Sequence, residues 1–234
     1  MQLFFSNTVE NQVTFTLEEN KHLTKVLRKK INDELFIIDG KGYLYTGKII
    51  FQDKKSSTVE ITNREKKEKT HKYYLHIALA PTKNISRFEW FLEKATEIGI
   101  DEITPIICER SERKTINFNR CEKILITAIK QSLKYHLPKL NNPISFNDFL
   151  KGEKFGDKFI AHCKEGKKIK LDKKVKERCV ILIGPEGGFS EKETNDIKSL
   201  KNTISVTLGN RILRSDTATT AAIFAVQSII EKEL

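Results

Sequence analysis

The sequence predicts an α/β protein in which a small, mostly antiparallel β-barrel precedes a larger domain with a mostly parallel sheet. Short β-rich runs and turns fill residues 1–62, whereas strands alternate with helices from residue 74 onward. Between them, residues 63–72 contain five Lys/Arg and no aliphatic side chain, which is typical of an exposed connection. We therefore expect domains at residues 1–70 and 73–234.

The N-terminal part carries the signals of a compact β unit. Residues 35–38 and 43–49 are β-rich runs on either side of a glycine-containing turn, and residues 57–62 alternate as a third strand. One helix is expected at about residues 18–30, with Leu23, Val26 and Leu27 on its apolar face. A small barrel is the natural closure for so short a β-rich unit.

The C-terminal part alternates in the manner of a parallel α/β domain. Ser86 and Glu89 form an expected capping box at the start of one helix, which Gly99 ends, and Ser190 and Glu193 form a second box. The expected strands are residues 74–79, 103–107, 159–163, 179–183 and 203–208. The other expected helices are residues 120–134 and the Ala-rich 216–232.

Charge and cysteine usage bound the partners and the compartment. Among 234 residues, 42 Lys+Arg face 31 Asp+Glu, a net charge of +11, which favours an anionic partner such as nucleic acid. The alternative is an ordinary Lys-rich surface. The cysteines, Cys108, Cys121, Cys163 and Cys179, form no C-x-x-C pair, so we expect no metal site and a reducing, cytoplasmic compartment. The N-terminus has no signal-peptide pattern, and no apolar run is long enough to span a membrane.

Residues 184–189 are the first candidate binding site. This loop places three glycines and Pro185 between an apolar strand and a capped helix. Ligands of open α/β sheets bind at the carboxyl ends of such strands, and glycines expose the backbone to a ligand. The alternative is an ordinary strand-to-helix turn. The spacing is not G-x-G-x-x-G, so a nicotinamide site is not indicated.

Residues 208–218 are the second candidate binding site, and they also connect an expected strand to an expected helix. Leu208, Ile212 and Leu213 supply apolar walls suited to an adenine, and Arg211 and Arg214 can grip an oxyanion. Asp216 lies in the first helical turn. Asp216 can act in catalysis or can simply stabilise the start of the helix.

Further basic residues lie between the two halves. They include Arg110, Arg113, Lys114, Lys130 and Lys134, and they suit either RNA or a solvated surface. Residues 164–178 hold eight Lys/Arg and favour a solvated loop. His162 follows an expected strand, where a structural histidine is the simplest interpretation.

Five motifs in order make the chain resemble the 16S ribosomal RNA (uracil-N3)-methyltransferase family, a branch of the knotted SPOUT methyltransferases. The motifs are His22-Leu23-x-x-Val26-Leu27-Arg28, residues 93–99 with Ile103-Thr104-Pro105 and Arg110-Ser111, Gln131-Ser132 with Leu137-Pro138, and the two loops above. The likeness covers nearly the whole chain.

The resemblance implies a PUA-like or OB-like RNA-binding barrel, a C-terminal domain with a deep trefoil knot, and a homodimer. It implies S-adenosylmethionine as cofactor and 16S ribosomal RNA in the 30S subunit, near the decoding centre, as substrate. The residues that it assigns to the cofactor are Ala161, His162, Leu182, Ile183, Gly184, Pro185, Glu186, Gly187, Gly188, Leu208, Gly209, Ile212, Leu213 and Arg214. Those that it assigns to RNA are Arg28, Arg110, Arg113, Gln131, Ser132 and Arg211.

The expected reaction transfers a methyl group to N3 of an extruded uracil. Arg214 is the candidate stabiliser of the uracil anion and Asp216 the candidate base. The alternatives are a non-catalytic RNA-binding ribosome-assembly factor and a methyltransferase of different RNA specificity.

Overall fold

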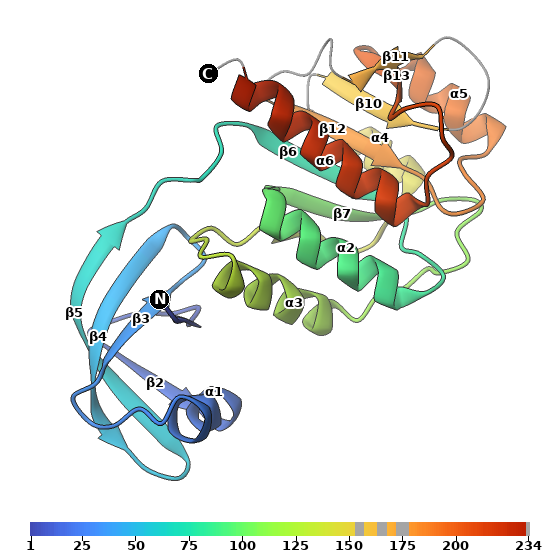
Figure 1. Cartoon of the computed structure of the whole chain (residues 1–234). Coiled ribbons are helices and arrows are strands. Elements are labelled where there is room, and N and C mark those ends of the chain that lie inside the picture. The colour runs from blue at the N-terminus through green and yellow to red at the C-terminus, as the bar shows by residue number, and fades with distance from the viewer. Residues whose placement is uncertain (153–156, 163–167, 172–177, 233–234) are drawn as a thin grey trace. The chain divides into compact units, whose positions relative to one another are not determined.

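A computed structural model describes residues 1–152, 157–162, 168–171 and 178–232. Cys163 and most of the Lys-rich residues 164–178 lie outside the described residues. The chain forms two compact units, Met1–Thr70 with Ile126–Leu137, and His71–Leu125 with Pro138–Leu234 (Figure 1).

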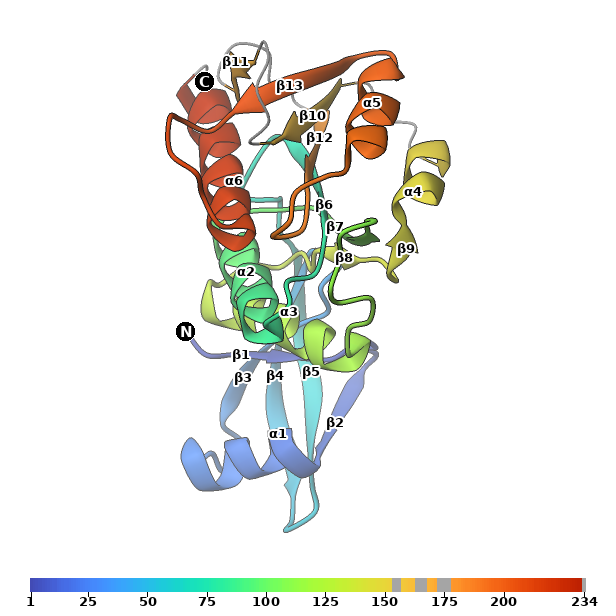
Figure 2. The ribbon, with the colours of Figure 1, turned by 90° about the vertical axis from the view of Figure 1, so that its right-hand side faces the viewer.

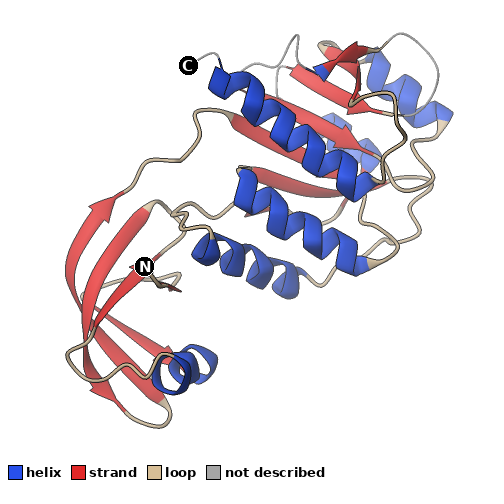
Figure 3. Ribbon diagram, viewed as in Figure 1, coloured by secondary structure: helices blue, strands red, loops and turns tan. Residues whose placement is uncertain are grey.

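The first unit is built on a curled five-stranded sheet (Figure 3). Its strands are β1 (Leu3–Phe5), β2 (Gln12–Thr16), β3 (Glu34–Ile38), β4 (Tyr43–Gln52) and β5 (Ser56–Lys66), in the order β1-β3-β4-β5-β2. Every pairing is antiparallel except that of β1 with β3. The inward side chains of Phe4, Phe15, Ile37 and Val59 are buried in its core. The predicted small, mostly antiparallel β unit is confirmed.

The predicted helix at residues 18–30 is too long, and one of its three expected apolar residues does not face the core, whereas Leu27 packs against it. Helix α1 (Leu17–Lys21) passes into a π-helical turn, η1 (His22–Val26), in which Leu27 N donates to His22 O. Leu23 is buried as predicted, but Val26 is 70% exposed. The wider π turn changes the angular spacing of the side chains, so the 3.6-residue periodicity no longer places Val26 on the buried face.

The predicted connection at residues 63–72 is also partly wrong, since β5 continues to Lys66, which is paired with Tyr43. The Arg64 guanidinium lies 3.8 Å from the centre of the Tyr43 ring. Strand pairing is made by the backbone, so an exposed strand needs no aliphatic side chains.

The second half of helix α3 (Phe118–Gln131) belongs to the first unit. Ile129 packs with Leu3, Ile38 and Leu44, and Lys130 Nζ lies 2.7 Å from Glu19 Oε1. Beyond the helix, a Cβ on Gly42 would lie 2.4 Å from the His136 ring, and φ at Gly42 is +96°. Only glycine permits so close an approach.

The second unit is built on an eight-stranded sheet, and all its strand pairs are parallel. Its strands are β6 (Tyr74–Leu79), β7 (Glu102–Ile107), β8 (Lys139–Leu140), β9 (Ile144–Ser145), β10 (Asp157–Ala161), β11 (Ile169–Lys170), β12 (Arg178–Ile183) and β13 (Thr203–Thr207). The order is β11-β13-β10-β12-β6-β7-β8, with β9 paired to β7. The predicted α/β fold with a parallel sheet is confirmed.

Helices cover both faces of this sheet (Figure 2). Helices α2 (Ile85–Ile98) and α6 (Ser215–Lys232) pack together on one face, and α4 (Phe146–Gly152) and α5 (Glu191–Ser199) lie on the other. On the α4–α5 side, Phe146, Phe149 and Ile197 pack against the alternate residues Val180 and Leu182 of β12. Alternation of buried side chains to both faces explains why these strands are continuously apolar.

The helix starts follow one prediction and contradict another. Ser190 and Glu193 form the predicted capping box of α5. The predicted box at Ser86 and Glu89 is wrong, because the Asn84 side chain caps α2 by accepting from Ser86 N at 3.1 Å. Asn is a strong N-cap residue, and Glu89 pairs with Arg120 instead.

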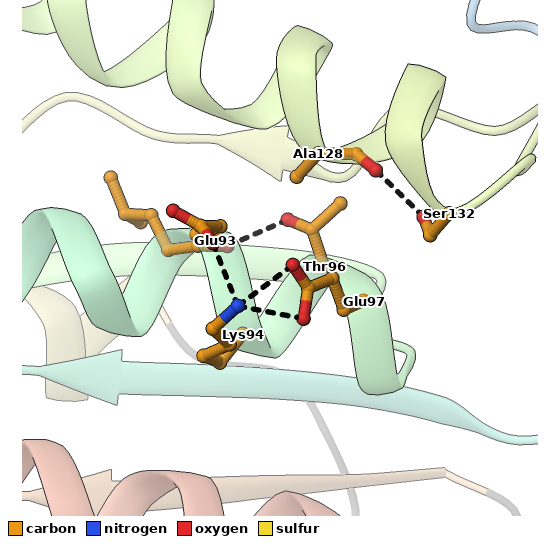
Figure 4. A network of polar contacts seen from close by, with 7 residues as sticks. Glu93, Lys94, Thr96, Glu97, Ala128 and Ser132 are labelled. Carbon is orange, nitrogen blue, oxygen red and sulfur yellow. Dashed lines mark hydrogen bonds and ion pairs between the residues drawn. The ribbon is translucent and has the colours of Figure 1, made fainter.

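Local polar contacts continue along the helices (Figure 4). Lys94 on α2 bridges Glu93 and Glu97, and Thr96 Oγ1 donates to Leu92 O. Directly after α3, Ser132 Oγ donates to Ala128 O of that helix at 2.7 Å. Each of these contacts joins residues that are close in sequence. The Ser132 hydroxyl is therefore already engaged as a donor to its own chain.

A buried polar cluster lies at the start of β7. Glu102 accepts from Tyr74, Asn141 and Lys139. Burial raises the pKa of the Glu102 carboxyl, but these hydrogen bonds outweigh burial and lower the pKa to about 2. The cluster therefore depends on an ionised carboxylate.

The described cysteines are buried, free thiols. Burial raises the pKa of Cys121 to about 11 and that of Cys179 to about 12, so both behave as small apolar residues. Within the described ranges, no cluster of His, Cys, Asp and Glu is arranged to hold a metal ion. No helix among those residues is both long and apolar enough to cross a membrane.

Candidate functional site

The two loops singled out in the sequence leave the second unit's sheet at the same edge. Strand β10 lies between β12 and β13, and its last residue, Ala161, is in register with Ile183 and Val206. All three strands are parallel, so their carboxyl ends coincide. Residues 184–189 and 208–214 therefore begin side by side, with His162 between them, at the edge where parallel α/β sheets bind ligands.

The loop at residues 184–189 has one structural part and one open part. A Cβ on Gly184 would lie 3.1 Å from the backbone and ring of Phe189, which is buried against Phe146, so Gly184 serves packing. Gly188 closes a turn by donating to Pro185 O at 2.8 Å, with φ at +67°. Apart from its chain neighbours, no atom of the described residues lies within 4 Å of where a Gly188 Cβ would stand. The Gly188 side of the loop is thus open to a ligand.

The loop at residues 208–214 presents a second open glycine. Gly209 has φ at +125°, and among the described residues only its chain neighbours come within 4 Å of its Cβ position. The Thr207 hydroxyl donates to Gly209 O at 2.8 Å and fixes the start of the loop. Arg211, Ile212 and Arg214 are exposed, and Leu213 is half-buried. The loop therefore offers backbone, apolar and cationic groups to solvent.

The first turn of α6 contains two buried polar atoms that lack a hydrogen-bond partner within the described part of the chain. They are Ser215 Oγ and Asp216 Oδ1. Buried polar atoms in native proteins are nearly always paired, so two adjacent exceptions indicate a missing partner. Sequence reasoning identified Asp216 but missed Ser215, whose only signal was its place next to Asp216.

The strand ends contribute in different ways. Leu182 and Ile183 are buried, so only their backbone atoms can serve a ligand, whereas Ala161 and Leu208 are half-buried. His162 Nε2 lies 3.2 Å from Ser205 Oγ on β13. This contact supports the structural interpretation of His162.

The residues expected to contact RNA fall in both units. Arg28 and Gln131 are exposed in the first unit, which also contains Ser132, and Arg211 is exposed in the second. Arg28 has φ at +54°, an uncommon conformation for a residue other than glycine.

Arg110 and Arg113 have partners within the second unit. Arg110 Nη1 donates to Gly187 O at 3.0 Å, and Arg113 donates to Thr82 O and Lys83 O. Both arginines therefore donate hydrogen bonds to backbone carbonyls of the same unit.

These features fit the expected cofactor, S-adenosylmethionine. The molecule carries hydroxyls, an ammonium and a carboxylate, which can pair with exposed backbone groups and with Ser215 and Asp216. Its adenine suits the apolar residues Leu208 and Leu213. Gly188 and Gly209 leave the space in which side chains would otherwise stand.

Known proteins resemble the chain over nearly its whole length. Residues 52–227 match the RNA methyltransferase domain family, and residues 16–62 match the RNA methyltransferase PUA domain family. The ribosomal RNA small subunit methyltransferase E of Buchnera aphidicola is 33% identical over 94% of this chain and 89% of its own.

Solved structures agree. A probable rRNA-methyltransferase from Porphyromonas gingivalis is 32% identical, with a TM-score of 0.93 over all of both chains. The ribosomal RNA small subunit methyltransferase E of Neisseria gonorrhoeae, solved bound to S-adenosyl methionine, is 27% identical, with a TM-score of 0.84 over 98% of each chain.

Proposed function

Because the chain belongs to the RNA methyltransferase family that includes ribosomal RNA small subunit methyltransferase E, we propose that it methylates small-subunit ribosomal RNA with S-adenosylmethionine. The observation that carries the proposal is the meeting of two open glycine loops and two unpartnered buried polar atoms at one sheet edge. This edge has the composition of a cofactor site, and a non-catalytic RNA-binding factor would not need it.

The proposed cofactor-binding residues come from three strand ends and the loops that follow them. Backbone groups of Leu182, Ile183 and residues 184–188 line one side, and Leu208, Gly209 and residues 212–214 line the other. Ala161 and His162 lie between them. When bound, S-adenosylmethionine supplies an electrophilic methyl group to a nucleophilic ring nitrogen.

We place the acid-base chemistry at the start of α6. Uracil N3 carries a proton that must leave before or during methylation, so the site needs a base and a cation. Asp216 is the proposed base, because its Oδ1 is buried and has no partner in the described chain. Arg214 is exposed two residues earlier and is the proposed stabiliser of the developing uracil anion.

The proposed substrate is a specific uridine near the decoding centre of 16S ribosomal RNA, methylated at N3 during 30S maturation. The PUA match, a net charge of +11 and the exposed Arg28, Gln131 and Arg211 support RNA binding. We further propose that Ser132 contacts RNA, that the C-terminal domain contains a trefoil knot, and that the protein is a homodimer. The exposed apolar side chains of Ile212 and Phe224, 87% and 61% accessible, support a dimer.

One experiment tests the reaction. The protein is incubated with labelled S-adenosylmethionine and 30S subunits from cells that lack this modification, and the labelled nucleoside is then identified. We expect 3-methyluridine. A ribose-methylated product would establish a different specificity, and no incorporation would favour a binding factor.

A further inference from the structure

Three loops at the candidate edge are tied together by charged side chains in the second unit. They are residues 80–84 between β6 and α2, residues 108–117 between β7 and α3, and residues 184–190 between β12 and α5. The first two are joined by Arg113, whose Nε and Nη2 lie 3.0 Å from Thr82 O and 2.7 Å from Lys83 O.

The glycine loop is held to both of the others. Arg110 Nη1 donates to Gly187 O at 3.0 Å. Glu109 N donates at 2.7 Å to the carboxylate of Glu193 on α5, which also accepts from Ser190 N at the end of the loop at 2.8 Å. From the other side, Lys83 N donates to Glu186 Oε1 at 2.9 Å. Each pair of loops is therefore linked, and these charge-assisted hydrogen bonds oppose movement of residues 184–190.

The stem of Arg110 also packs on the glycine loop. A Cβ on Gly187 would lie 3.4 Å from Arg110 Cβ and 3.5 Å from Arg110 Cδ. The side chain of Arg110 thus covers Gly187, while the neighbouring Gly188 position remains open. One face of the loop is supported by the chain and the other is available to a ligand.

We infer that Arg110 and Arg113 are positioning residues that hold residues 184–188 in the conformation that binds S-adenosylmethionine. The inference rests on the proposed function and assigns both arginines to the cofactor site and not to RNA phosphate. Fixing a loop before binding removes the entropic cost of ordering it, and this strengthens affinity.

A lysine is expected to replace Arg110 but not Arg113. Arg110 uses one donor on one carbonyl, and a lysine ammonium can make one such bond. Arg113 directs a planar fork to two carbonyls, and a point-charge ammonium does not reproduce that geometry. Conservative rescue should therefore succeed at Arg110 and fail at Arg113.

The test measures affinity for S-adenosylmethionine alone by calorimetry and, separately, affinity for a 16S RNA transcript. Because each arginine makes charge-assisted bonds, Arg110→Ala and Arg113→Ala should weaken cofactor affinity by about tenfold or more. Arg110→Lys should stay within about threefold of wild type, and Arg113→Lys should be as weak as Arg113→Ala. The matched control, Arg120→Ala, removes the same charge from the same unit and should leave cofactor affinity unchanged.

RNA affinity decides between the two assignments. We expect both alanine variants to bind the transcript as well as Arg120→Ala does. Unchanged cofactor affinity combined with a selective loss of RNA affinity would overturn the inference. Circular dichroism verifies folding, and Arg113→Lys replaces Arg113→Ala if the latter does not fold. Wild-type protein that binds no S-adenosylmethionine would instead refute the proposed function.

Discussion

Replacing Glu193 by Gln tests whether one buried carboxylate holds the glycine loop, the start of α5 and the β7–α3 loop together. Glu193 is 6% exposed, and its two oxygens accept from Glu109 N at 2.7 Å and Ser190 N at 2.8 Å. Glutamine offers one acceptor oxygen, so one of these amides loses its partner and faces an NH₂ group. A hydrogen bond to a charged group contributes about 1.5–3 kcal/mol, so we expect a loss of about 2–3 kcal/mol in the free energy of unfolding.

Urea unfolding followed by the fluorescence of Trp90 measures this loss, because Trp90 is the only tryptophan and lies on α2 of the second unit. Glu191→Gln is the matched control, since Glu191 is exposed in the first turn of the same helix. It should cost no more than about 1 kcal/mol through the helix dipole. If Glu193→Gln is no more destabilising than Glu191→Gln, the carboxylate does not join the loops as described.

Three further predictions concern the cofactor loop, the base and acid stability. Gly209→Val should abolish calorimetric S-adenosylmethionine binding without loss of fold, because φ is +125° and the added side chain enters the open space; normal binding would remove Gly209 from the site. Asp216→Asn should lower turnover by roughly a hundredfold while cofactor affinity holds, whereas unchanged turnover would leave Asp216 as a helix-start residue. The folded pKa of Glu102, about 2, lies below its ordinary 4.5, so its stabilisation is complete above pH 4.5 and is lost as the pH falls toward 2. Glu102→Gln should remove about 2 kcal/mol of that acid dependence between pH 6 and pH 3, as measured by urea unfolding, and an identical pH profile would contradict the assignment.

The parallel sheet was predictable because its signals are local. Runs such as Val180–Leu182 are apolar at every position, which only burial on both faces explains, and Ser190 with Glu193 marks a helix start within four residues. Parallel strands alone place the two glycine loops at the same edge of the sheet, but the strand order that brings them close together required the structure. The register of Ala161 with both Ile183 and Val206 required the structure.

The sequence-based predictions were wrong where another residue competed for a helix N-cap and where an α-helix changed into a π turn. Asn84, two residues before Ser86, is the N-cap of α2. Glu89 therefore does not complete a capping box and forms an ion pair with Arg120. The π turn after Lys21 turns Val26 outward, although its spacing from Leu23 suits an α-helix. Arg110 and Arg113 look like surface cations in sequence, because carbonyl acceptors carry no side-chain signal.

The grouping of α3 bears directly on the proposed RNA surface. The predicted domain division assigns Gln131 and Ser132 to the C-terminal domain, since both lie within residues 73–234. In the structure, Ile129 and Lys130 anchor this end of α3 in the first unit, through Leu3, Ile38, Leu44 and Glu19. Gln131 and Ser132 thus share a compact unit with Arg28, from which they are separated by about a hundred residues of sequence. This grouping supports the proposed role of the first unit in RNA binding, since that unit contains Arg28, Gln131 and Ser132.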